Sequence, residues 1–160
     1  MSAKRHERTA ARRAALQVLY SSELVGAPAA QLIDEGRFLE DEDALSAYAI
    51  DLAKGTAANQ GEIDAYLKDA SDNWSLDRMP VVDRCLLRMA VYEMIYVDKV
   101  PLSVSINEAV DLAKEFGGED ESSRFVNGVL GRIAKVLQPV DAEAAACDDA
   151  DQSGEVPDGE

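Results

Sequence analysis

The apolar residues of this 160-residue chain recur at intervals of three or four positions, and this spacing constrains the fold more than any other feature. Ala11, Ala15, Val18 and Leu19 form one such stripe within residues 4–25. A spacing of three or four residues places side chains on one face of an α-helix. No stretch of useful length alternates between apolar and polar residues, as a half-buried strand would. The pattern therefore predicts an all-α fold.

Helix start and stop signals divide the chain into about seven helices. Gly26-Ala27-Pro28 ends the first helix, Pro80 opens a later one, and Gly117-Gly118 ends the last but one. Ser105 and Glu108 have the spacing of a capping box. The expected helices cover residues 4–25, 29–35, about 45–55, 58–70, 80–97, about 101–117 and 123–137, with Asp41 or Asp43 as the cap of the third, Ser122 or Ser123 as the cap of the seventh, and a single turn at 74–76.

Residues 80–97 are apolar around most of the helix circumference, which predicts a central, buried helix. Arg84 and Arg88 flank Glu93 within this helix. A catalytic acid is one interpretation of Glu93, but the neighbouring sequence offers no partner nucleophile. We therefore expect Glu93 to be a structural carboxylate paired with arginine.

The segment Phe125–Arg132, FVNGVLGR, contains an Asn-Gly pair, which between apolar runs is typical of a hairpin turn. The helical stripe nevertheless continues through the pair from Val126 to Leu137, and no alternating strand flanks it. We therefore predict a helix. Each glycine in a helix costs about 1 kcal/mol relative to alanine, so we expect a neighbouring helix backbone to pack closely against Gly128 and Gly131.

The net charge of −15 is unevenly distributed. Residues 141–160 hold eight acidic residues and no Lys or Arg, which predicts a disordered acidic tail beyond a domain of residues 1–140. Residues 1–13 hold five basic residues against one acidic residue, a balance of +4. On a helix, this basic arm would gather positive charge on one side of the exposed first turns, where it can contact a phosphate backbone. Its basic residues are Lys4, Arg5, Arg8, Arg12 and Arg13.

Residue types that carry catalysis are sparse. His6 is the single histidine, and the two cysteines, Cys85 and Cys147, lack the spacing of a metal site. The chain has no nucleotide-binding or nucleophile-elbow motif. We predict a protein that is not an enzyme and that uses no metal or cofactor. The absence of a signal peptide or membrane-span pattern predicts a cytoplasmic location.

Three motifs, taken together in this order along the chain, are specific enough to indicate a protein family. The first is Arg8-x-x-x-Arg12-x-x-Ala15-Leu16-Gln17-x-Leu19-Tyr20. The second is Asp77-Arg78-x-Pro80-x-x-Asp83-Arg84-x-Leu86-Leu87-Arg88, continuing into Tyr92-Glu93. The third runs from Val100-Pro101 through Ile106-Asn107-Glu108-Ala109-Val110-x-Leu112-Ala113-Lys114 to Phe125-Val126-Asn127-Gly128-Val129-Leu130. Together they resemble the NusB family of transcription antitermination factors, whereas residues 26–70 match that family in helical pattern alone.

The resemblance implies two packed three-helix bundles that bind RNA without transforming it. NusB-like proteins bind the boxA element of ribosomal RNA leaders together with NusE, a ribosomal small-subunit protein. That complex joins the elongating RNA polymerase with other Nus factors and suppresses premature termination. Some family members self-associate, so a homodimer is a further expectation.

Site residues follow from the matched positions and from the charge pattern. The residues expected to meet RNA are Lys4, Arg5, Arg8, Arg12, Arg13, Asp120, Phe125 and Asn127. Phe125 would serve as a stacking platform beside the basic arm, with a core position as the alternative. The residues expected to face NusE are Tyr20, Leu24, Asp77 and Asp83, and Tyr20 could equally be core. We also hypothesise that the acidic tail competes with RNA for the arm.

Two alternatives belong to other classes. The first is a helical protein–protein adaptor without RNA binding, which the acidic net charge favours and the basic arm disfavours. The second is the RNA-binding portion of a ribosomal RNA methyltransferase, because such enzymes carry a similar helical domain. A methyltransferase needs a long cofactor-binding domain, and residues 138–160 do not supply one.

Overall fold

The computed structural model describes residues 2–36, 45–71, 75–117 and 120–138, with the side chains of residues 2–5 and 120 left undescribed. These ranges hold seven α-helices and one 3₁₀ turn, and no strand. The all-α prediction is confirmed. Asp41, Asp43 and the acidic tail lie outside the described residues. The elements are α1 (Ser2–Val25), α2 (Ala29–Glu35), α3 (Ala47–Ala58), α4 (Gln60–Ala70), η1 (Leu76–Arg78), α5 (Val81–Tyr96), α6 (Leu102–Gly117) and α7 (Asp120–Leu137).

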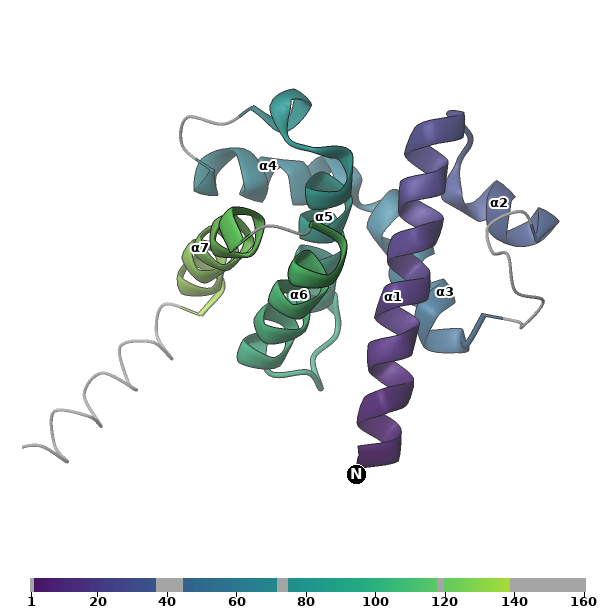
Figure 1. Ribbon diagram of the computed structural model, residues 1–160, viewed down its shortest axis with the longest axis horizontal. Helices are drawn as coiled ribbons and strands as arrows, with labels where there is room; N and C mark the ends of the chain where they lie inside the picture. The colour runs from purple at the N-terminus through teal and green to yellow at the C-terminus, as the bar shows by residue number, and fades with distance from the viewer. Residues whose placement is uncertain (1, 37–44, 72–74, 118–119, 139–160) are drawn as a thin grey trace, which may run out of the picture.

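The helices form two groups that share a central helix (Figure 1). Helices α1, α2 and α3 lie on one side, and α4, α6 and α7 lie on the other. Helix α5 lies between the groups and packs against α1, α3, α4, α6 and α7. Every residue from 85 to 94 is buried, which leaves no solvent-facing side over almost three turns. The prediction of a central, buried helix is confirmed.

Helix α3 begins and ends later than the sequence predicted. Ser46 is its N-cap, and the Ser46 hydroxyl accepts a hydrogen bond from the Ala49 amide at 3.2 Å. The helix continues through Gly55, which was expected to end it. A methyl group at Gly55 would collide with the ring of Tyr92 on α5. Gly55 is therefore a point of close helix packing rather than a stop signal.

Ser105, which has capping-box spacing, and Ser122, one of the two predicted caps of the seventh helix, both lie inside helices. Helix α6 begins at Leu102, so Ser105 is in its first turn, and α7 begins at Asp120, so Ser122 follows its start. The Ser105 hydroxyl donates to Glu93 at 2.7 Å, and the Ser122 hydroxyl donates to Asp83 at 2.6 Å. Both hydroxyls thus bond carboxylates of α5 in place of their own helix termini.

The segment 125–132 is helical, as predicted, but its glycines do not serve close packing. No atom lies within 4 Å of the position that a methyl group would take at Gly128 or at Gly131. The prediction of a closely packed neighbouring backbone at these glycines is therefore wrong. The buried side of α7 is formed by its branched apolar residues instead, namely Val126, Val129, Leu130 and Ile133. Within the described ranges, no helix has the length and apolar character needed to cross a membrane.

Candidate nucleic-acid interface

The basic arm lies on the first half of α1, but its cations do not form one exposed row. Lys4 and Arg5 lie in the helix, and their side chains are outside the described part. Arg8 and Arg13 are both half-buried, and Arg13 forms a two-point ion pair with Glu115 of α6 at 3.0 Å for each bond. The pKa of Arg13 is raised above its ordinary value chiefly by this hydrogen bond.

Arg12 is buried, with 3% of its surface exposed, so the prediction that it presents charge on the surface is wrong. Its Nε donates to both carboxylate oxygens of Glu93, at 3.1 and 2.9 Å. Its Nη1 donates to Glu108 Oε1 at 3.0 Å. The burial has a physical reason, because two carboxylates from α5 and α6 turn inward at this level of α1. Arg12 is the cation that pairs with both of them.

The same carboxylates bind three hydroxyl groups around Arg12. Glu93 accepts from Ser105 and from the hydroxyl of Tyr48 on α3, and Glu108 accepts from Thr9 at 2.8 Å. Burial, followed by the hydrogen bond to Glu93, raises the pKa of Tyr48 above its ordinary value. This buried cluster therefore ties α1, α3, α5 and α6 together.

Glu93 is a paired structural carboxylate, as expected, but its cation comes from α1 rather than from α5. Arg88 and Arg84 precede Glu93 by five and nine residues on the same helix. At 3.6 residues per turn, these intervals place both arginines nearly opposite Glu93 around the helix axis. They bind other acids: Arg88 forms a two-point pair with Asp64 of α4, and Arg84 pairs with Glu23 of α1.

Arg8 lies one turn before Arg12 and stacks on an aromatic ring. Its guanidinium carbon is 4.6 Å from the ring centroid of Tyr48. The Arg12 guanidinium lies 5.9 Å from the same centroid. Tyr48 is therefore in contact with both the arm and the buried cluster, a position that nothing in its sequence neighbourhood indicated.

A cavity of about 640 Å³ opens where the end of α1 meets the starts of α5 and α7. It brings together Tyr20, Asp83 and Phe125, which are more than 100 residues apart at the extremes. Its remaining walls come from the turn before α5, the end of α6 and the first turn of α7, namely Met79, Pro80, Val81, Val82, Phe116, Gly117, Glu121 and Ser122. The cavity thus unites one residue predicted to meet RNA with two predicted to face NusE.

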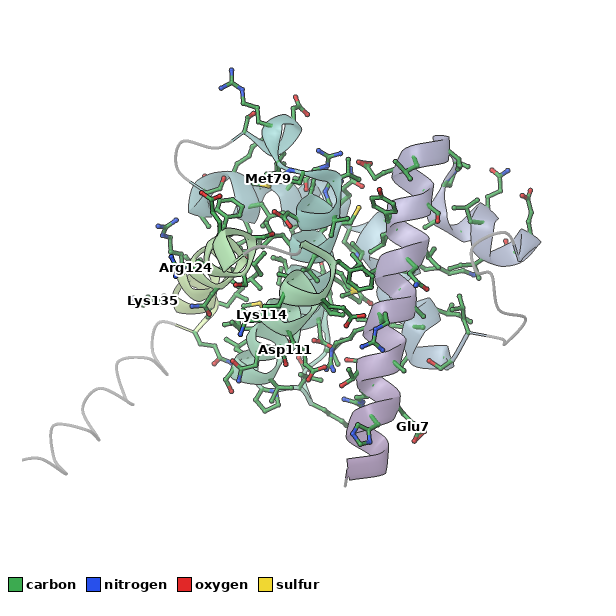
Figure 2. The ribbon with its side chains drawn as sticks, in the orientation of Figure 1. Glu7, Met79, Asp111, Lys114, Arg124 and Lys135 are labelled. Atoms are coloured by element: carbon green, nitrogen blue, oxygen red, sulfur yellow. The ribbon has the colours of Figure 1, made fainter. Side chains whose placement is uncertain are left out.

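The cavity and the arm lie towards opposite ends of the molecule. Met79 lines the cavity, and it lies at the far end of the view from Glu7 of the arm (Figure 2). Tyr20 follows Arg8 by twelve residues on α1, which corresponds to roughly 18 Å along the helix axis. Phe125 shares the cavity with Tyr20, so it does not lie beside Arg8, contrary to expectation. A ligand that contacts both must be extended.

Phe125 meets both alternatives that the sequence left open, a core position and an accessible aromatic ring. It is half-buried and packs against the core, and it also lines the cavity. Asn127 is exposed on α7, whereas Asp120 begins that helix with its side chain outside the described part. Tyr20 likewise is half-buried and lines the cavity.

The other residues expected to face NusE differ in exposure. Leu24 is 61% exposed near the end of α1, which is unusual for a large apolar side chain, and Asp77 is exposed on η1. Asp83 is 5% exposed, and it accepts the hydrogen bond from Ser122. An exposed Asp83 carboxylate, as a direct partner contact would require, is therefore not found. Asp83 instead fixes the start of α7 to the start of α5 within the cavity wall.

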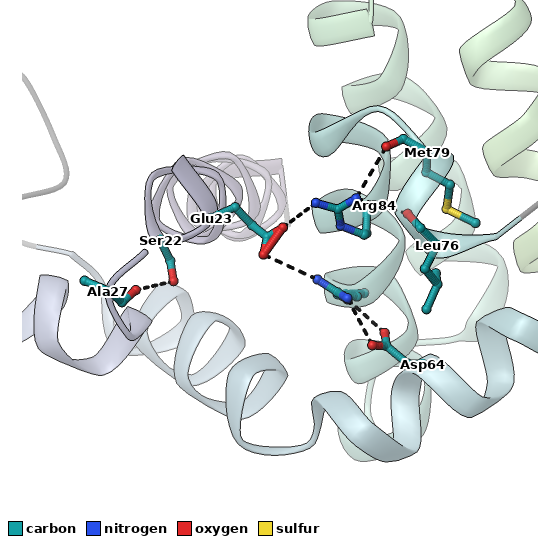
Figure 3. A network of polar contacts seen from close by, with 8 residues as sticks. Ser22, Glu23, Ala27, Asp64, Leu76, Met79 and Arg84 are labelled. Carbon is teal, nitrogen blue, oxygen red and sulfur yellow. Dashed lines mark hydrogen bonds and ion pairs between the residues drawn. The ribbon is translucent and has the colours of Figure 1, made fainter. Parts of the chain in front are cut away.

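A polar network that the sequence did not reveal joins Glu23, Arg84 and Met79, which are close in sequence to residues expected to face NusE (Figure 3). Glu23, next to Leu24 in sequence, accepts from the Arg84 guanidinium. Arg84 also donates to the carbonyl oxygens of Leu76 and Met79, at 3.0 and 3.4 Å, which bracket Asp77. Arg84 therefore holds η1 against the end of α1. From the sequence, Arg84 was expected to pair with Glu93, because both residues lie on the same helix.

Comparison with known proteins decides the family. A family model described as "NusB family" matches residues 9–135, which is well over half of the chain. The chain belongs to the NusB family. The transcription antitermination protein NusB of Halalkalibacterium halodurans is 41% identical over 127 residues, which cover 79% of this chain and 92% of that protein. The predicted family is confirmed, and with it the family's role in transcription antitermination.

Solved structures of NusB proteins have the same fold. NusB of T. maritima is 35% identical, with a TM-score of 0.69 over 80% of this chain and 90% of that one. A structure of the antitermination factors NusB and NusE with double-stranded RNA matches at 31% identity and a TM-score of 0.68, over 82% of this chain and 98% of that one. Among the described residues of this chain, no three His, Cys, Asp or Glu side chains gather as a metal site would require.

Proposed function

We propose that this chain acts as a non-catalytic antitermination factor that binds single-stranded boxA RNA together with NusE and so joins the elongating RNA polymerase. It would act in the cytoplasm, where nascent ribosomal RNA is made. The observation that carries the proposal is the cavity that unites Tyr20, Asp83 and Phe125. One surface can therefore contact RNA and protein at the same time.

The RNA side of the proposal rests on a cation and an aromatic ring. Single-stranded RNA is bound through phosphate contacts and through stacking of bases on aromatic side chains. Arg8 supplies a cation on the arm, and Phe125 supplies a ring at the cavity. Because these groups are separated along α1, the proposed RNA lies extended along this helix and reaches the cavity at Phe125.

The protein side rests on an exposed apolar residue beside a fixed turn. Leu24 presents an apolar side chain at the end of α1, and Arg84 holds the Asp77 turn next to it. A central apolar contact with a polar rim is the usual anatomy of a protein interface. We therefore assign this end of the molecule to NusE.

Two substitutions distinguish RNA binding from NusE binding. Fluorescence anisotropy would measure binding of a boxA-type single-stranded RNA, with and without NusE, from about 50 to about 200 mM salt. Arg8→Ala should weaken RNA binding and reduce the slope of log affinity against log salt by about 1. Leu24→Asp should abolish the gain from NusE and leave the affinity for RNA alone unchanged, because Leu24 is remote from the arm.

Matched controls lie on α7. Lys135→Ala removes one exposed positive charge away from the arm, and Val136→Asp changes an apolar residue that is 63% exposed. Neither should alter RNA or NusE binding. RNA affinity that falls equally with Arg8→Ala and Lys135→Ala would show a nonspecific charge effect. Failure of the native chain to bind RNA even with NusE would favour the adaptor function instead.

A further inference from the structure

The Arg8 guanidinium stacks on the ring of Tyr48. The guanidinium carbon lies 4.6 Å above the ring centroid, within the range of a favourable cation–π contact. Tyr48 is on the first turn of α3, forty residues from Arg8 in sequence. Arg8 is half-buried as a result, although it lies on a helix end that the sequence predicted to be exposed.

A stacked guanidinium remains able to bind phosphate. The ring engages the flat face of the group, whereas its five N–H donors lie in the plane and point outward at the edge. Two parallel N–H bonds from that edge match two phosphate oxygens. Stacking thus restricts the rotation of a long side chain without using its hydrogen bonds, which lowers the entropy lost when the phosphate binds.

The Tyr48 ring is itself held in place by the buried cluster. Its hydroxyl donates to Glu93, which is fixed by Arg12 and by Ser105. A buried cluster of one arginine and two carboxylates is expensive to desolvate and contributes little net stability in comparison with apolar packing. Its effect here is geometric, since it joins Tyr48 on α3 to the helix that carries Arg8.

We propose that Tyr48 is a positioning residue for RNA binding, and that it presents the edge of the Arg8 guanidinium to an RNA phosphate. The inference rests on the proposed function, because it acts through Arg8. It also gives Arg12 an indirect part in RNA binding: the buried arginine fixes Glu93, Glu93 fixes Tyr48, and Tyr48 orients the arginine that lies one turn earlier on α1.

A double-mutant cycle tests the proposal. RNA affinity would be measured for the native chain, Tyr48→Leu, Arg8→Ala and the double variant, with Tyr96→Leu on α5 as the control for loss of a partly exposed tyrosine. Tyr48→Leu should weaken RNA binding by about two- to fivefold in the native background, because the phosphate must then fix a side chain that the ring had already restricted. It should have no further effect once Arg8 is alanine. Tyr48→Phe keeps the ring but loses the hydrogen bond to Glu93, so its affinity should lie between that of the native chain and that of Tyr48→Leu.

A second measurement needs neither RNA nor a variant. In the NMR spectrum of the free native chain, the δ-methylene protons of Arg8 should be shifted upfield by the Tyr48 ring, relative to those of the exposed Arg124. The absence of this shift would overturn the inference even if Tyr48→Leu failed to fold.

The possible outcomes separate the two proposals. Loss of affinity with Tyr48→Leu that persists in the Arg8→Ala background would overturn the inference, because Tyr48 would then act independently of Arg8. RNA binding that depends on Arg8 but ignores Tyr48 would overturn the inference alone. A Tyr48→Phe variant as weak as Tyr48→Leu would assign the effect to the hydroxyl and refute the role of the ring. No RNA binding by the native chain would refute the proposed function, and the inference with it.

Discussion

Replacement of Arg12 by methionine tests the buried cluster most directly. The side chains of Glu93 and Glu108 are 3% and 8% exposed, and Arg12 donates three hydrogen bonds to them. Methionine preserves much of the volume but leaves two buried carboxylates facing one another without a cation. Removal of one partner from a buried ion pair costs about 3–5 kcal/mol. We expect Arg12→Met to lower the free energy of unfolding by that amount.

Urea unfolding followed by far-UV circular dichroism at neutral pH gives the measurement. The same helix provides a matched control, because Arg13 forms an ion pair of similar geometry with Glu115 at the surface. An exposed pair is worth about 0–1 kcal/mol, since water screens the charges and the side chains lose entropy. Arg13→Met should therefore change stability by no more than that.

A second substitution separates charge from packing. Glu93→Gln in the Arg12→Met background removes one of the two uncompensated charges, so part of the lost stability should return. If Arg12→Met costs no more than Arg13→Met, or if the double variant recovers nothing, the reasoning is wrong. The four helices would then be held together by apolar packing without a contribution from the charges.

Three further predictions concern single sites. Gly55→Ala should lower the free energy of unfolding by about 1–3 kcal/mol in thermal or urea unfolding, because the added methyl group displaces the Tyr92 ring; a neutral result would contradict the close packing. Gly128→Ala should raise it by about 0.5–1 kcal/mol, because open space surrounds that position and alanine favours the helix; a loss of stability would contradict this. Burial raises the pKa of the Cys85 thiol from 9.0 to about 12, so the folded chain retains a proton that the unfolded chain releases. The free energy of unfolding should therefore fall as pH rises through this range. In urea unfolding, Cys85→Ala should reduce the fall between about pH 8 and about pH 10.5; an equal fall in the native chain and in the variant would refute the assignment.

Helix identity was predictable because it depends on local periodicity. The stripe through residues 126–137 outweighed the Asn-Gly pair, and the apolar circumference of residues 80–97 indicated a central helix before any contact was known. Helix ends were harder to place. Ser105 and Ser122 have the chemistry of caps, but buried carboxylates compete for the same hydroxyl groups, and a sequence does not show which acceptor lies nearer.

The candidate site was harder to predict because its contacts cross the chain. The sequence of the arm predicts one row of positive charge. Arg12 nevertheless turns inward to carboxylates that lie more than 80 residues away in sequence. The pairing of Arg12 with Glu93 depends on how α1 lies on α5, which periodicity does not specify. Tyr48 lies in the part of the sequence that resembled the family least. The cavity joins residues from four helices, so its membership follows from packing alone.

The central position of α5 also sets the order in which the chain can fold during synthesis. Helices α1, α2 and α3 are complete by residue 58, but the inner faces of α1 and α3 pack on a helix that ends at Tyr96. Arg12 likewise lacks its two carboxylates until Glu93 and Glu108 have been made. The first half of the chain therefore leaves the ribosome with an open apolar face and an uncompensated arginine. Stable folding must wait until α5 and the start of α6 have emerged from the ribosome.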